Sequence, residues 1–188
     1  NMTTEVRATD LLIAPPGIQD PRFANTIILI THDQPKGSFG LCVNKPTEYT
    51  LDQILEDSDI DIINPPRLPV YWGGPMCPGS LWMLHSTDWV CSKTTMLTSA
   101  WAMTSAEEMF HCLADGDAPK YFRIVMGYAS WGPGQLTCEI EGIGPWKKDT
   151  SWLVAHNLGP EWLFDQDPEN LWASCTTLCS HQAVDSWL

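Results

Sequence analysis

The sequence predicts a single α+β domain. Short β-branched and aromatic segments typical of strands recur along the chain, as at 26–31 and 121–125, and short helix signals lie between and after them. With 188 residues, of which 44% are hydrophobic, the chain can bury one substantial core. It contains neither repeats nor a linker, so we assign residues 1–188 to one domain.

The first strands are separated by proline and glycine turns. Residues 11–14 predict a short buried strand that ends at a pair of prolines. Asp20 follows in a turn, where it either caps Phe23 and its neighbours or faces a ligand. Residues 26–31 are apolar through the middle, which indicates a central strand covered on both faces.

Three further segments carry polar candidates at strand ends. A glycine turn feeds a strand that ends at residue 46, where Asn44 either satisfies backbone groups or binds a ligand. Gly73 and Gly74 form a turn with the following proline, and His85 closes the next strand. A histidine there can act as a general base, but no Cys or Ser with a third orienting group lies near it in sequence, which favours a buried histidine with satisfied hydrogen bonds.

Helices are predicted from capping boxes and from a proline start. The capping boxes pair Thr50 with Gln53, Thr104 with Glu107 and Ser105 with Glu108. The last helix is predicted to begin at Asp167-Pro168.

The stretch 127–136 joins an apolar strand to a helix. Three glycines and a proline within eight residues predict a turn, and Gln135 and Glu139 then lie one helical turn apart. Ser130, Gln135 and Glu139 either converge with the turn amides on a small pocket, or the stretch is a joint in which Trp131 fills the core. The G-x-x-S-x-G spacing places Ser130 off the apex of a nucleophile elbow, so we predict no hydrolase.

Together these segments resemble the YqgE/AlgH family of bacterial proteins and their plant relatives over most of the chain. The matching segments are L-I-A-P-P-G-I-Q-D-P-R-F, G-S-F-G-L-C-V-N-K-P, G-G-P, L-H, G-Y-A-S-W-G-P-G-Q-L and a late F-x-x-x-x-x-x-x-W. Pro15 departs from the family, which often has Met there. The resemblance implies a mixed, strongly curved sheet of six to eight strands, a pseudo-barrel flanked by short helices. It implies a fold rather than a reaction.

Charge and motifs exclude several classes of ligand. The net charge is −13, and only Lys147 and Lys148 are adjacent basic residues, so we expect no direct binding to nucleic acid. Neither a Walker motif nor a dinucleotide glycine motif occurs, and we predict no cofactor.

The cysteines and the termini bear on metal binding and compartment. Seven scattered cysteines predict free thiols in a reducing compartment. Cys175, Cys179 and His181 resemble half a zinc site, but helical spacing explains them equally well, and we predict no metal. Without a membrane span or signal pattern the protein is expected to be cytoplasmic. The alternative is a plastid or another organelle after removal of a targeting peptide, since Asn1 ahead of Met2 fits a processed terminus or a cloning scar.

Two functions of different class are predicted. The first is a non-enzymatic binding or protein-interaction module, such as a subunit, adaptor or indirect regulator, that engages a small ligand or an unknown protein partner. Its surface is drawn from Asp20, Asn44, Gly73, Gly74, His85, Ser130, Gln135 and Trp146. Residues 142–149 are inserted relative to the family, and the tryptophan in them predicts either a docking loop or a loop that covers the sheet. The alternative function is an enzyme that acts on a small molecule, with His85 and Gln135 or Glu139 in one cleft.

Overall fold

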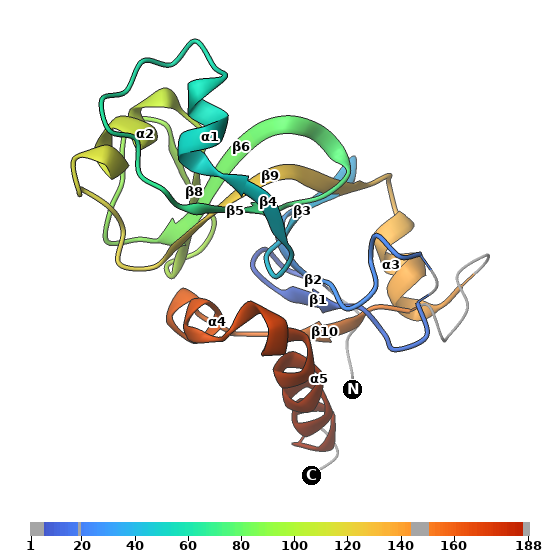
Figure 1. The fold of residues 1–188 in the computed structure, drawn as a ribbon. Coiled ribbons are helices and arrows are strands. Elements are labelled where there is room, and N and C mark those ends of the chain that lie inside the picture. The colour runs from blue at the N-terminus through green and yellow to red at the C-terminus, as the bar shows by residue number, and fades with distance from the viewer. Residues whose placement is uncertain (1–5, 19, 144–150, 186–188) are drawn as a thin grey trace.

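The architecture is one curled sheet with short helices on both faces (Figure 1). The structure is a computed structural model that describes residues 6–18, 20–143 and 151–185, with side chains as far as residue 179. The strands are β1 (Leu11–Ile13), β2 (Ile27–Gln34), β3 (Gly37–Cys42), β4 (Pro46–Thr50), β5 (Pro69–Trp72), β6 (Met76–Ser86), β7 (Thr94–Met96), β8 (Trp101–Thr104), β9 (Phe122–Trp131) and β10 (Leu153–Ala155). The helices are α1 (Leu51–Glu56), α2 (Glu107–Ala114), α3 (Gln135–Glu141), α4 (Pro160–Asp165) and α5 (Pro168–Asp185).

The predicted fold class is confirmed. In the described part of the chain the sheet has ten strands in the order β10-β1-β2-β3-β9-β6-β8-β7, and β4 and β5 lie off this path. Neighbours are antiparallel except β5 and β9, which are parallel, so the sheet is mixed. It exceeds the predicted six to eight strands because it includes short polar strands such as β4 and β7, which lack an apolar pattern.

β9 is the central strand. It pairs with β6 along one side, and with β5 and then β3 along the other. The expected turn at Gly127 was wrong, because the strand continues through this residue to Trp131. Gly127 has a φ of 81°, which a strand tolerates at a glycine.

The connection between β5 and β6 crosses β9 at this glycine. Trp72 of β5 and Leu81 of β6 both pair with Met126, so the two strands flank β9 and the chain between them must pass over it. A Cβ on Gly127 would lie 2.4 Å from the Gly74 oxygen, and one on Gly74 would lie 2.2 Å from the Tyr128 carbonyl carbon. Only glycine fits at this crossing.

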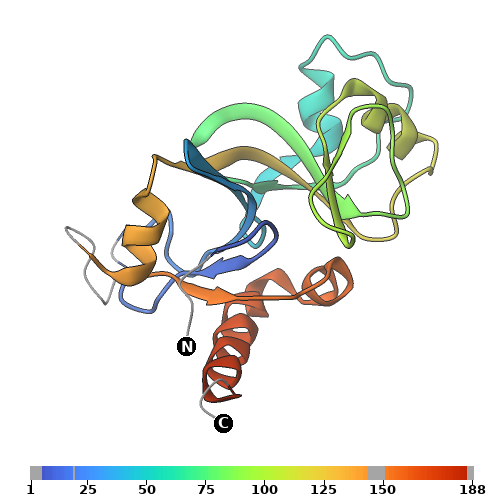
Figure 2. The ribbon, with the colours of Figure 1, turned by 180° about the vertical axis from the view of Figure 1, so that it is seen from behind.

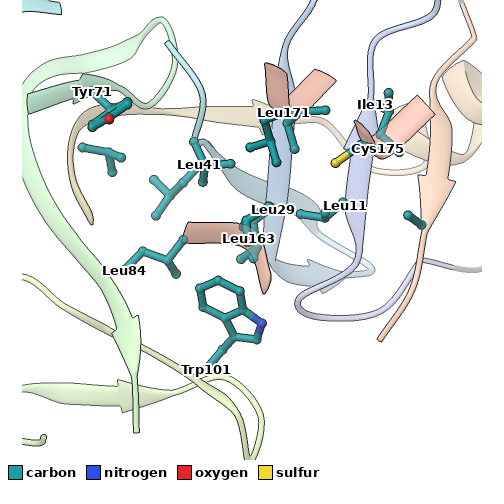
Figure 3. Packing of buried hydrophobic residues seen from close by; sticks show 14 of the residues in the cluster. Leu11, Ile13, Leu29, Leu41, Tyr71, Leu84, Trp101, Leu163, Leu171 and Cys175 are labelled. Carbon is teal, nitrogen blue, oxygen red and sulfur yellow. The ribbon is translucent and has the colours of Figure 1, made fainter. Parts of the chain in front are cut away.

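Helices pack against both faces of the sheet. Alternate residues of the strands point to one face, where α4 and α5 cover them, as Figure 3 shows for Leu29, Leu84 and Trp101 against Leu163 and Leu171. The opposite face packs against α3 at one end and against α1 and α2 at the other (Figures 1 and 2). β2 therefore needs apolar side chains on both faces, which Ile27 and Leu29 supply on one and Ile28 and Ile30 on the other.

Helix starts were predicted with mixed success. The Thr50 amide donates to Gln53 Oε1 at 3.1 Å, as its capping box predicted. The predicted boxes at Thr104 and Ser105 were wrong, because α2 begins at Glu107 after Ala106. Thr104 is the last residue of β8, and its hydroxyl is held by His85.

Candidate functional site

The predicted surface residues lie apart, and several of them have structural partners. Asn44 is 6% exposed, and its side chain bonds two backbone groups, accepting from the Ile27 amide at 2.9 Å and donating to the Asn25 oxygen at 2.8 Å. Asp20 accepts from the Arg22 amide and forms an ion pair with its guanidinium at 2.9 Å. Asn44 thus satisfies backbone groups, as one of its two interpretations has it, and the Asp20 carboxylate bonds the amide of Arg22, a neighbour of Phe23.

The 127–136 stretch is a strand-to-helix joint, as one of its two interpretations predicted. Gln135 accepts from the Gly132 amide and donates to Glu139, each at 2.9 Å. The other Glu139 oxygen accepts from the indoles of Trp131 at 3.3 Å and Trp152 at 2.9 Å. The carboxylate thereby joins β9, α3 and the segment before β10, and these side chains are occupied with one another. Ser130 is exposed beside them.

His85 is a buried, satisfied histidine, as expected. Its Nδ1 lies 2.7 Å from the Ser86 carbonyl, which only accepts, so Nδ1 carries the proton. Nε2 then accepts from the Thr104 hydroxyl at 2.8 Å. Burial lowers the pKa of His85.

The predicted enzyme cleft does not form. His85 pairs with Phe122 at the start of β9, whereas Gln135 follows Trp131 at its end. The ten-residue strand between them spans about 30 Å of extended chain. Gly73 and Gly74 lie at the crossing over β9.

Other predicted features fall partly outside the described residues. Trp146 and most of the 142–149 insertion lie there, as does the His181 side chain, and the docking loop stays a prediction. No group of three potential metal ligands occurs among the side chains that the structure describes. In the same part of the chain, no helix is both long enough and apolar enough to cross a bilayer.

A groove that was not predicted lies on the sheet face that α4 and α5 partly cover. Its volume is about 420 Å³. Its lining comes from six strands: Thr31, His32, Gln34, Phe39, Gly40, Leu41, Trp82, Thr95, Met103 and Tyr128. Because β2 and β7 line it together although four strands separate them in the sheet, this face is concave.

Aromatic rings form one wall of the groove. The Tyr128 ring contacts Phe39 at 5.9 Å between centroids and Trp82 at 6.4 Å, with interplanar angles of 53° and 90°. The Trp82 indole N–H is enclosed and meets no hydrogen-bond acceptor among the described residues. The neighbouring Cys77 thiol raises the pKa of the Tyr128 phenol, which is therefore uncharged near neutral pH. One feature of the sequence could have pointed to this groove, because four of its lining residues lie in the segments that resemble the family: Phe39, Gly40, Leu41 and Tyr128.

The comparisons with known proteins agree with this architecture. The AlgH-like family matches residues 11–183. A UPF0301 protein of Methylococcus capsulatus is 32% identical over 180 residues, covering 95% of this chain and 92% of its own length. One of Cereibacter sphaeroides is 36% identical over 183 residues, covering 93% and 91%.

Two solved structures are similar. The solution structure of the AlgH protein from Pseudomonas aeruginosa superposes with a TM-score of 0.74 at 28% identity and covers 94% of this chain and 91% of its own. The crystal structure of protein DIP2367 from Corynebacterium diphtheriae, with a TM-score of 0.62 at 23% identity over 84% of this chain and 80% of its own, shares the fold. The matches in sequence and in structure span nearly the whole chain, and it belongs to the AlgH-like family.

Proposed function

We propose that this chain is a non-catalytic binding protein that holds a small ligand in the concave groove. The observation that supports this proposal is the groove, which has a volume of about 420 Å³ and is lined largely by apolar and aromatic side chains. Sites for small molecules typically measure about 300 to 1,000 Å³ and have this kind of lining.

Polar side chains in the groove can orient a ligand. Gln34 and Thr95 line it and offer hydrogen-bonding groups to a molecule that enters.

The hydrogen bonds around the groove favour binding over catalysis. The Thr31 hydroxyl donates to the Phe39 carbonyl at 3.2 Å, and His32 Nδ1 lies 3.0 Å from the same hydroxyl. A nucleophilic threonine would need to give its proton to a base that a third group orients. Among the described residues, no carboxylate bonds to His32, so the third group of such an arrangement is not present there.

A ligand screen with a blocked groove tests the proposal. Thr95 lies on β7, is exposed and lines the groove, so Thr95→Trp fills the space at little cost to the fold. Met96→Trp is the matched control, because adjacent strand residues point to opposite faces and Met96 is 53% exposed. Compounds found by ligand-observed NMR should bind the wild type and Met96→Trp, and bind Thr95→Trp at least about tenfold more weakly.

Two results would contradict the proposal. One is a broad metabolite library in which no compound binds. The other is a set of compounds that bind Thr95→Trp as well as they bind the wild type. Turnover of a bound compound by the purified protein would instead favour the enzyme.

A further inference from the structure

We propose that the groove binds a small free quaternary ammonium compound. The inference rests on the proposed function and names the ligand class of the same site. It follows from the geometry of the three rings, from the charge of the whole chain and from the charge of the groove.

Three aromatic rings meet in the wall of the groove. Phe39, Tyr128 and Trp82 come from three strands, and the Tyr128 ring is steeply inclined to both of the others. Rings at centroid distances of 5.9 and 6.4 Å contact one another, so a guest meets them from the groove side rather than between them. Ring faces carry negative electrostatic potential, so they attract cations, most strongly at tryptophan.

The charge of the protein favours the same ligand. A net charge of −13 draws cations toward the surface and repels anions. The described residues that line the groove include no Lys or Arg to oppose a cation. An anionic ligand would meet unfavourable charge without a compensating guanidinium or ammonium group.

The absence of carboxylates selects a quaternary cation over a primary amine. A primary ammonium has three N–H donors that need acceptors when it leaves water, and the described lining offers no Asp or Glu. A trimethylammonium group has no N–H and is weakly hydrated, so aromatic faces and the apolar surfaces of Leu41 and Met103 can replace its water. The rest of the volume holds a short tail, whose oxygen can accept from the Gln34 amide or the Thr95 hydroxyl.

The test compares choline with its uncharged carbon isostere, in which a tert-butyl group replaces the trimethylammonium. Both are titrated by calorimetry at about pH 8, above the range in which histidine titrates. Choline should bind at least about tenfold more tightly, because only it gains the interaction with the rings. Ethanolamine, the primary amine of the same length, should bind more weakly than choline.

Two sets of variants locate the effect. Phe39 is 41% exposed, so Phe39→Leu removes a ring at small cost to stability and should weaken choline about threefold without changing the isostere. Thr95→Glu and Thr95→Lys both lengthen the side chain at the groove edge and differ from each other in the sign of its charge. We expect choline to bind about tenfold more tightly to the first than to the second, and the isostere to bind the two variants equally.

The outcomes separate the two proposals. Equal binding of choline and the isostere, or library compounds that bind while choline does not, would overturn the ligand class and leave the binding function standing. Binding to phosphatidylcholine vesicles without a response to free choline would overturn the assignment to a free small molecule. A library in which nothing binds removes the proposed function and this inference together.

Discussion

At the scale of single residues, His85 is kept neutral by its surroundings. Its ring lies within a chain of hydrogen bonds in which Thr94 donates to Thr104 at 2.8 Å and Thr104 donates to Nε2. A second proton on the ring would reverse the Thr104 bond inside the sheet. Burial is the largest cause of its lowered pKa, and the Ser86 carbonyl and Asp88 oppose it.

The titration of His85 predicts a loss of stability in mild acid. An unfolded histidine takes up a proton near a pH of about 6.5, while folded His85 resists it to a lower pH. Its contribution is therefore complete above pH about 6.5 and is lost as the pH falls through the folded pKa, with a slope of up to about 1.4 kcal/mol per pH unit. Urea unfolding of His85→Gln between pH about 7.5 and 5 should show a shallower slope than the wild type. His111→Gln, exposed on α2, is the control, and identical slopes for wild type and His85→Gln would contradict the prediction.

At the scale of elements, the passage of the β5–β6 connection over β9 depends on Gly127. In Gly127→Ala the new methyl group would have to share the space of the Gly74 oxygen, 2.4 Å away, at a φ of 81°. Gly134→Ala is a matched control, because Gly134 has a φ of 73° and a Cβ added there would meet no atom within 4 Å. We expect a loss of about 1 to 2 kcal/mol for Gly134→Ala and more than about 3 kcal/mol for Gly127→Ala. Equal losses in denaturant unfolding would show that the close approach is not what requires glycine.

Individual elements were predictable where their pattern is local. A few consecutive residues are enough to predict the apolar strands β2 and β9 and the start of α5 at a proline. The crossing over β9 was not predictable, because the pairing of β5 with β9 joins segments about fifty residues apart, as Val70 and Ile124 show. Arg123 illustrates the same limit. It is 8% exposed, and its guanidinium lies over the rings of Tyr71 and Phe164, which come from segments far away in the sequence.

The candidate site was the least predictable feature, for the same reason. The side chains of Asn44, Gln135 and Glu139 are of types that are common in binding sites. In the folded protein they instead accept hydrogen bonds from backbone amides and from an indole N–H. The groove is built from six strands, of which β2 and β3 contribute three residues each and the other four one each. Side chains such as Trp82 and Met103 become part of a site only when the sheet curls.

At the scale of the whole molecule, the charge of −13 predicts opposite responses to DNA and to a cation. A chain of this charge repels phosphates, so labelled duplex DNA should show no binding by fluorescence polarisation at about 0.15 M salt, and lowering the salt should not create any. A protein that neutralises phosphates with a basic patch behaves in the opposite way, because counterion release strengthens binding as salt falls.

Choline is attracted by the same negative charge and should bind more weakly as salt is added, since the Debye length falls from about 30 Å at 0.01 M to about 8 Å at 0.15 M. The carbon isostere serves as the uncharged control and should show no such dependence. DNA binding that strengthens in low salt, or choline affinity that ignores salt, would show that the net charge does not govern what approaches this protein.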